Sequence, residues 1–125
     1  MRPALVITVL AISAINAGCI PVSIPDNPEI NGRIVDASTH TPILGAAIVV
    51  NKSGPRNTVL ATSLSDNDGS FVILGAKHTQ WIPVAYDLFL PPITIKADAA
   101  GYNSSKVEIS PWQPWNGTIE LFHKP

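Results

Sequence analysis

The strongest constraint on the fold of this chain is its proline content. Twelve prolines are spread along 125 residues. A proline inside a helix removes a backbone hydrogen bond and clashes with the preceding turn. No segment between the prolines has a convincing helical period. A helical bundle or coiled coil is therefore excluded, and the chain is expected to fold with strands and turns.

Apolar residues predict where the strands lie. Alternation with a period of two indicates a strand with one buried and one wet face, and three segments show it: 93–98, 106–110 and 118–121. Four segments are more uniformly apolar, as strands near the centre of a sandwich are: 30–36, 46–50, 58–62 and 71–74. Seven short strands separated by turn residues predict an all-β, seven-stranded sandwich. Phe71 and the strand Ile, Val and Leu residues are the expected core, with 30–36 at an edge.

The amino-acid composition excludes several classes of binding partner. The chain is 46% hydrophobic and 14% charged, which favours a folded domain over a disordered one. Eight Lys and Arg stand against nine Asp and Glu, a net charge of −1. This balance offers neither the basic stripe of a nucleic-acid binder nor a polybasic segment for anionic lipid. The single Cys excludes an internal disulfide framework.

Residues 1–19 have the layout of a secretory signal peptide. Arg2 is followed by an uncharged apolar run and then by the small residues Ala17 and Gly18. The alternative is a transmembrane anchor. Spanning a bilayer takes about 20 apolar residues, whereas the uncharged segment 4–17 is only fourteen residues long. The length therefore favours a signal peptide.

The end of this segment resembles the lipobox of bacterial lipoproteins. In that family the peptide is cut directly before a Cys, whose thiol carries a diacylglycerol and whose new amine is acylated. Ala17, Gly18 and Cys19 match the pattern, whereas Asn16 departs from it because the family prefers Leu there. The resemblance implies lipid attachment at Cys19. An ordinary signal peptide, leaving a secreted or periplasmic domain without lipid, is the alternative.

Three parts follow from this interpretation: a lipoprotein signal peptide at 1–18, a lipidated Cys with a Pro-rich tether at 19–29, and a β-sandwich domain at 30–125. The tether has three prolines within residues 21–28, which favour extended polyproline geometry. Ile20 stands where enterobacterial-type sorting would use Asp for retention in the inner membrane. The expected location is the bacterial cell envelope, with the outer membrane favoured where the organism has one.

Four short motifs follow one another in the predicted sandwich: NGRIVD at 31–36, TPILGAA at 41–47, DNDGSF at 66–71 and AAGY at 99–102. This series resembles the carboxypeptidase regulatory-like domain, which implies a transthyretin-like, immunoglobulin-like Greek-key sandwich of seven strands. The resemblance covers residues 30 to about 110 and implies an accessory domain without a catalytic one. The hydrophobic segment 76–92 is longer than the connection usual in that family. Part of it is expected to pack as an additional strand or flap, and part to meet a partner.

The motif residues have structural roles in this interpretation. Gly32 lets a neighbouring strand approach closely, while Asp66 bonds the backbone of its own turn and Gly69 supplies a positive φ. The same turn suggests a calcium loop, but the twelfth position of an EF-hand loop requires Glu, and the chain has Lys77 there. A structural turn is therefore the better interpretation.

No catalytic, cofactor-binding or metal-binding site is predicted, so the protein is expected not to be an enzyme and to take no cofactor. His40, His78 and His123 fall in separate loops or at the terminus, outside any zinc motif, and are expected to be solvated. No G-x-S-x-G nucleophile elbow is present. An adhesin domain with a Lys–Asn isopeptide bond would need a Lys on the first strand, where Arg33 is the only long cation.

Three tryptophans are the candidate contacts for a partner or a glycan. Trp112 and Trp115 flank a short Gln-Pro segment, and Trp81 lies in the 76–92 segment. The alternative is that they cover apolar area at the open end of the sandwich. The leading hypothesis is a non-enzymatic, membrane-anchored binding or structural module whose partner is another envelope protein. A carbohydrate-binding module that uses Trp112 and Trp115 is the second hypothesis.

Overall fold

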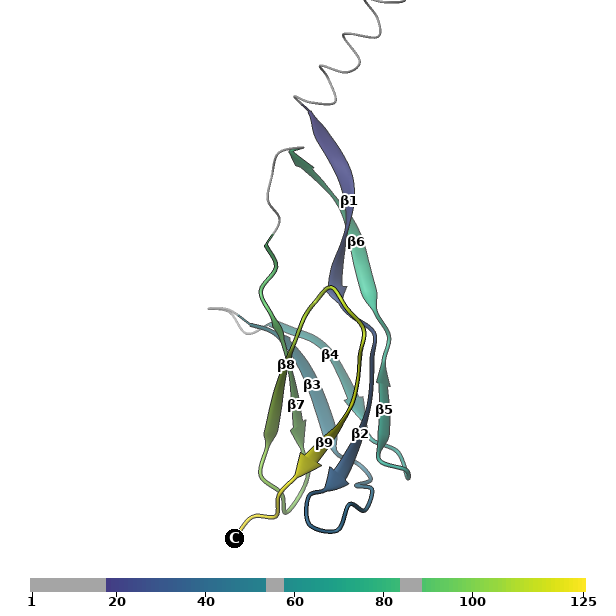
Figure 1. The fold of residues 1–125 in the computed structure, drawn as a ribbon, viewed down its shortest axis with the longest axis vertical. Coiled ribbons are helices and arrows are strands. Elements are labelled where there is room, and N and C mark those ends of the chain that lie inside the picture. Colours follow the sequence, from purple (N-terminus) through teal and green to yellow (C-terminus); the bar gives the residue numbers. More distant parts are fainter. Residues whose placement is uncertain (1–17, 54–57, 84–88) are drawn as a thin grey trace, which may run out of the picture. The chain divides into compact units, whose positions relative to one another are not determined.

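The computed structural model describes residues 18–53, 58–83 and 89–125. The chain divides into two compact units, one of Met1–Ile24 with Lys77–Phe89 and one of Pro25–Ala76 with Leu90–Pro125. The second is called the sandwich unit below. The described residues form nine strands rather than the seven that were predicted (Figure 1). The all-β class is confirmed, and the strand count is wrong.

One sheet of the sandwich unit has three strands in the order β5 (Ser70–Ile73), β2 (Ile30–Asp36) and β9 (Trp115–Leu121). β2 pairs antiparallel with β5 and parallel with β9, from Ile30 opposite Trp115 to Asp36 opposite Leu121. The prediction that this first sandwich strand lies at an edge is therefore wrong. The last strand of the chain returns to cover its free side.

The other sheet has four strands in the order β4 (Thr58–Leu64), β3 (Ala47–Lys52), β7 (Ile93–Asp98) and β8 (Ser105–Ile109), all antiparallel. The predicted alternation on β7 is confirmed, because Ile93, Ile95 and Ala97 are buried. The prediction that residues 58–62 lie near the centre is wrong. β4 is an edge strand with mostly exposed or half-buried side chains, since an apolar run by itself does not distinguish centre from edge.

The core lies between the two sheets, which face one another in Figure 1. Its buried cluster takes residues from both sheets and from the β2–β3 loop, and includes Phe71 as predicted. Gly32 allows the ring of Phe71 to lie close to the backbone of β2. A Cβ at Gly32 would lie 2.5 Å from the ring of Phe71, so the predicted role of this glycine is confirmed.

The turn between β4 and β5 has the predicted structural chemistry. Asp66 Oδ1 accepts hydrogen bonds from the backbone N–H groups of Asp68 and Ser70, each at 2.9 Å. Gly69 has φ +75°. The buried Ser65 hydroxyl donates to the carbonyl of Ile43 at 2.6 Å and accepts from the N–H of Ala46 at 2.9 Å. These bonds join the turn to the start of β3.

The remaining two strands, β1 (Cys19–Asn27) and β6 (Ala76–Pro83), form a separate two-stranded sheet, called the ribbon below. The polyproline geometry predicted for residues 21–28 is wrong, because residues 21–27 lie in β1, whereas the additional strand expected within 76–92 is confirmed. Pro21 and Pro25 are four residues apart, and backbone N–H groups alternate sides along a strand. Both prolines can therefore turn their missing N–H toward the unpaired edge of β1, where a strand tolerates proline.

Candidate functional site

Cys19, the predicted lipid attachment residue, is the first residue of β1 and a free, exposed cysteine. The predicted signal peptide at 1–18 lies almost wholly outside the described residues, which begin at residue 18. Trp81, on β6, has 66% of its surface exposed. Both side chains are thus accessible in the described part of the ribbon.

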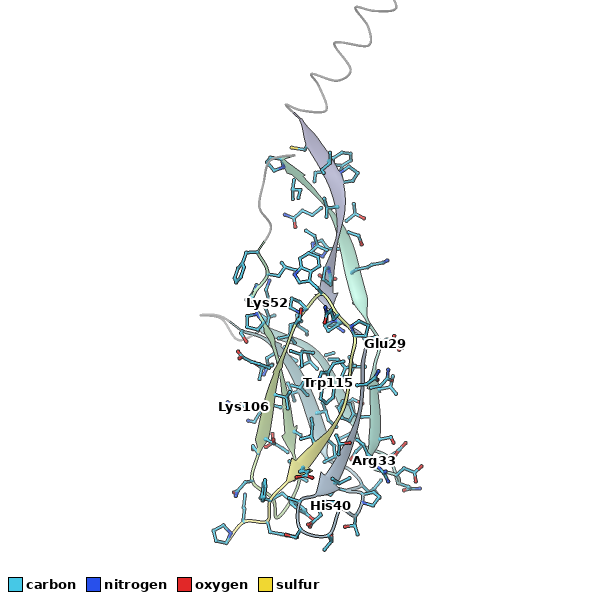
Figure 2. All side chains as sticks on the ribbon, in the orientation of Figure 1. Glu29, Arg33, His40, Lys52, Lys106 and Trp115 are labelled. Carbon is cyan, nitrogen blue, oxygen red and sulfur yellow. The ribbon has the colours of Figure 1, made fainter. Side chains whose placement is uncertain are left out.

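Trp112 and Trp115 have different environments. Trp115, at the start of β9, packs against the buried core (Figure 2). A Cβ at Gly117 would lie 2.5 Å from its ring, and one at Gly32 would lie 3.1 Å from it, so the indole covers both glycines. Trp112 lies in the turn before β9 and is 50% exposed. Of this pair, only Trp112 is an exposed side chain.

The two tryptophans should therefore respond differently to truncation. Trp115→Ala is expected to lower the free energy of unfolding by about 2–4 kcal/mol, because it removes a large ring that packs on the core and leaves a cavity. Trp112→Ala is expected to change it by no more than about 0.5 kcal/mol, as most surface substitutions do. Urea unfolding followed by circular dichroism measures both. Equal losses would contradict the environments described above.

One buried carboxylate, that of Asp36, lies where the end of β2, the β7–β8 turn and the C-terminal residues meet. Asp36 is 3% exposed. Its Oδ1 accepts from the backbone N–H groups of Ser38 at 2.8 Å and Thr39 at 3.1 Å. Its Oδ2 accepts from the Tyr102 hydroxyl at 2.8 Å and lies 2.5 Å from His123 Nε2. Four donors from three parts of the chain therefore converge on one carboxylate.

The C-terminal residues are held to the β7–β8 turn by further contacts. The rings of Tyr102 and His123 stack with centroids 4.4 Å apart. The N–H of Asn103 donates to the carbonyl of Phe122 at 2.8 Å, and the N–H of Lys124 donates to the carbonyl of Gly101 at 3.0 Å. The interpretation of His123 as a simply solvated side chain is wrong, because it contacts Asp36 while its outer side remains exposed.

The hydrogen bond from Tyr102 holds the pKa of Asp36 well below its ordinary value. Burial of the carboxyl acts in the opposite direction, while the N–H groups of Ser38 and Thr39 and the charge of His123 lower the pKa further. The same hydrogen bond raises the pKa of Tyr102. Asp36 is therefore an ionised carboxylate that its surroundings stabilise in this form.

In nucleophilic catalysis, an Asp–His pair orients the histidine toward a Ser, Thr or Cys side chain within hydrogen-bond reach of the ring. Among the described residues, no Ser, Thr or Cys side chain contacts His123; its contacts are with Asp36 and Tyr102. The arrangement joins three segments of the sandwich through Asp36, Tyr102 and His123. The sequence motifs contained Asp36 and Tyr102, but the contribution of the C-terminal histidine had no sequence signal.

In the part of the chain that the structure describes, no group of three or more His, Cys, Asp or Glu side chains is arranged to hold a metal ion. The residues Asp66 and Asp68 serve the β4–β5 turn, through the side chain of Asp66. No helix that is long and apolar enough to cross a membrane occurs within the described ranges.

No protein-family model matches the sequence. No curated protein matches it either. Among solved structures, the chain is similar to a variant of the shaft pilin SpaA from Lactobacillus rhamnosus GG, with a TM-score of 0.54 and 14% identity over 83% of this chain and 51% of that chain. The C-terminal domain of the same pilin matches with a TM-score of 0.53 and 14% identity, over 82% of this chain and 99% of that domain.

A group B streptococcus pilus 2b backbone protein is also similar, with a TM-score of 0.49 and 19% identity over 78% of this chain and 41% of that one. The chain spans between 41% and 51% of the length of the longer pilin structures it matches. At these identities the likeness to SpaA shows the fold. The sandwich unit therefore has a pilin-like, immunoglobulin-like β-sandwich fold.

Proposed function

We propose that this chain is a lipid-anchored module of the bacterial cell envelope, in which the β-sandwich has a structural or binding role and not a catalytic one. The observation that carries the proposal is an exposed Cys19 at the start of β1, which follows an apolar segment with a lipobox-like end and precedes a pilin-like sandwich. The shaft pilin SpaA from Lactobacillus rhamnosus GG has a similar fold. The partner of this chain would be another envelope protein.

The resemblance to the carboxypeptidase regulatory-like domain belongs to this proposal. Its motif residues each have a structural task in the fold: Gly32 contacts the Phe71 ring, Gly69 closes the β4–β5 turn, and Asp36 and Tyr102 share a hydrogen bond. These tasks are what an accessory sandwich requires.

The cross-linked adhesin alternative receives no support from the pairing of β2 with β9. Arg33, the only long cation on β2, lies opposite Thr118 and donates through Nε to the backbone carbonyl of Asp68 at 2.9 Å. No lysine stands on either of these strands. An amide bond between a Lys and an Asn across this pair is therefore not available to the chain.

The anchor is tested by intact mass and membrane fractionation of the wild type and of Cys19→Ser in a bacterial host. The wild type is expected in the membrane fraction, starting at Cys19 and carrying the added mass of acyl chains. Cys19→Ser is expected to lose the acyl mass and to leave the membrane, because the thiol is the only site for the diacylglycerol.

Asn16→Leu is the matched control, since it brings the segment closer to the lipobox pattern and should preserve or improve processing. A soluble wild type without acyl mass would contradict the anchor. That outcome would instead favour a secreted or periplasmic domain without lipid.

A further inference from the structure

The two ends of the ribbon differ in chemistry. β1 and β6 are hydrogen-bonded neighbours that run in opposite directions (Figure 1), so Cys19 at the start of β1 and Pro83 at the end of β6 lie at the same end. No charged residue occurs at 19–25 of β1 or at 79–83 of β6. The charged residues Asp26 and Lys77 stand at the opposite end of the ribbon.

The uncharged end also presents large apolar side chains to solvent. Trp81 lies two residues before the end of β6 and is 66% exposed, and Ile20, next to Cys19, is 37% exposed. A two-stranded sheet is marginally stable in water unless another layer covers it. Trp81 and Ile20 are therefore available to a surface that would cover this end of the ribbon.

We infer that this end of the ribbon is a membrane-interface contact, in which Trp81 and Ile20 insert among the headgroups of the bilayer that holds the lipid of Cys19. The inference rests on the proposed function, because the acyl chains on Cys19 would place this end of β1 at the bilayer surface. A Trp suits this position because its ring is apolar while its N–H can face water. Apolar area inserted at the interface adds to the membrane binding that acyl chains supply.

Because this end of the ribbon carries no charged side chain, it is suited to contact neutral lipid. Recognition of anionic headgroups uses Lys or Arg clusters and weakens with salt, and residues 19–25 and 79–83 contain neither cation. The contact is therefore apolar and interfacial. It should form on neutral phosphatidylcholine and be insensitive to ionic strength.

Fluorescence quenching tests whether Trp81 meets the bilayer. The full processed protein is reconstituted into phosphatidylcholine vesicles with or without bromine on the acyl chains. Brominated lipid is expected to quench part of the emission of the wild type and of Trp112→Phe, and the quenched part is expected to be absent from Trp81→Phe. Equal quenching of the wild type and Trp81→Phe would overturn the inference, as would no quenching at all.

Transfer of the protein from donor to acceptor vesicles gives a second readout. Trp81→Ser is expected to transfer about tenfold faster than the wild type, since the burial of one large apolar side chain is worth about that factor in an equilibrium. Trp112→Ser, a change of the same kind at an exposed Trp of the sandwich unit, should leave the rate unchanged. Equal rates for the wild type and Trp81→Ser would overturn the inference and point to a protein partner for Trp81.

Intact mass separates this inference from the proposed function. An acylated protein whose Trp81 is not quenched would retain the lipid anchor and overturn the ribbon contact. A protein without acyl mass would contradict the anchor, and quenching of its Trp81 by added vesicles would still support the contact.

Discussion

Gly69→Ala is expected to lower the free energy of unfolding by about 2–5 kcal/mol. Part of this cost arises because alanine is strained in the left-handed backbone conformation, and the rest arises because the added methyl group overpacks the turn. Gly69 has φ +75°, and a Cβ there would overlap the backbone carbonyl oxygen of Ile34. The backbone cannot easily retreat, because the N–H of Ile34 donates to the carbonyl of Gly69 at 2.7 Å. The Ile34 carbonyl in turn accepts from the N–H of Ile43 at 3.0 Å.

Gly45→Ala is the matched control for this prediction. Gly45 also has φ +75°, but no atom lies within 4 Å of where its Cβ would stand. The substitution is expected to cost about 1–2 kcal/mol, the conformational part alone. Urea unfolding of both variants therefore isolates the clash with Ile34. Equal losses would show that the β4–β5 turn can shift away from β2.

Asp36→Asn is expected to destabilise the sandwich at neutral pH and to remove most of its acid sensitivity. The substitution keeps the shape of the side chain but replaces a carboxylate that receives four hydrogen-bond donors. One oxygen becomes an amide NH₂ group, which cannot accept from the Tyr102 hydroxyl or from His123. Thermal unfolding of the wild type and the variant from about pH 7 to about pH 2 measures the effect.

The direction of the pH dependence follows from the pKa of Asp36, which is lowered in the folded state from an ordinary value of 3.8. A group whose pKa is lower in the folded than in the unfolded state stabilises the fold above the unfolded pKa. Its contribution is lost as the pH falls below about 3.8 toward the lowered folded value. The melting temperatures of the wild type and Asp36→Asn should therefore differ most at neutral pH and converge in acid.

Two further variants examine the cause of this pKa shift. Tyr102→Phe removes the hydrogen bond that lowers the pKa of Asp36 most, so its acid transition should move to higher pH. Asp68→Asn is the control for Asp36→Asn, because it replaces an exposed carboxyl by an amide. It should leave the pH of the acid transition unchanged. An acid transition of Asp36→Asn identical to that of the wild type would show that Asp36 does not control the acid stability.

The positions of most sandwich strands could be predicted because their signals are local. Alternating residues such as those of β7 face the core and solvent in turn, and turn residues such as Asp66 and Gly69 act within a few positions of one another. The ribbon was not predicted in this form. Its prolines suit both a solvated polyproline segment and an edge strand, and only the presence of β6 beside β1 distinguishes the two.

For the candidate contact residues, the sequence identified which residue types could bind a partner but not how exposed each side chain is. Trp112 and Trp115 look equivalent in sequence, yet only Trp115 lies over Gly32 and Gly117 and packs on the core. The contact between Asp36 and His123 could not be predicted from the sequence for the same reason. Asp36 and His123 are far apart in the chain, and no periodicity or motif connects them.

Local chemistry was therefore sufficient for the all-β class, the turn structures, the core face of strands such as β7 and the candidacy of Cys19. The folded chain was needed to place β9 parallel to β2, to move β4 to an edge, to pair β1 with β6 and to bring His123 to Asp36. The physical reason is the range of the forces involved. Turn geometry and strand alternation arise between near neighbours, whereas strand partners are selected by the burial of side chains that meet only after the whole chain has folded.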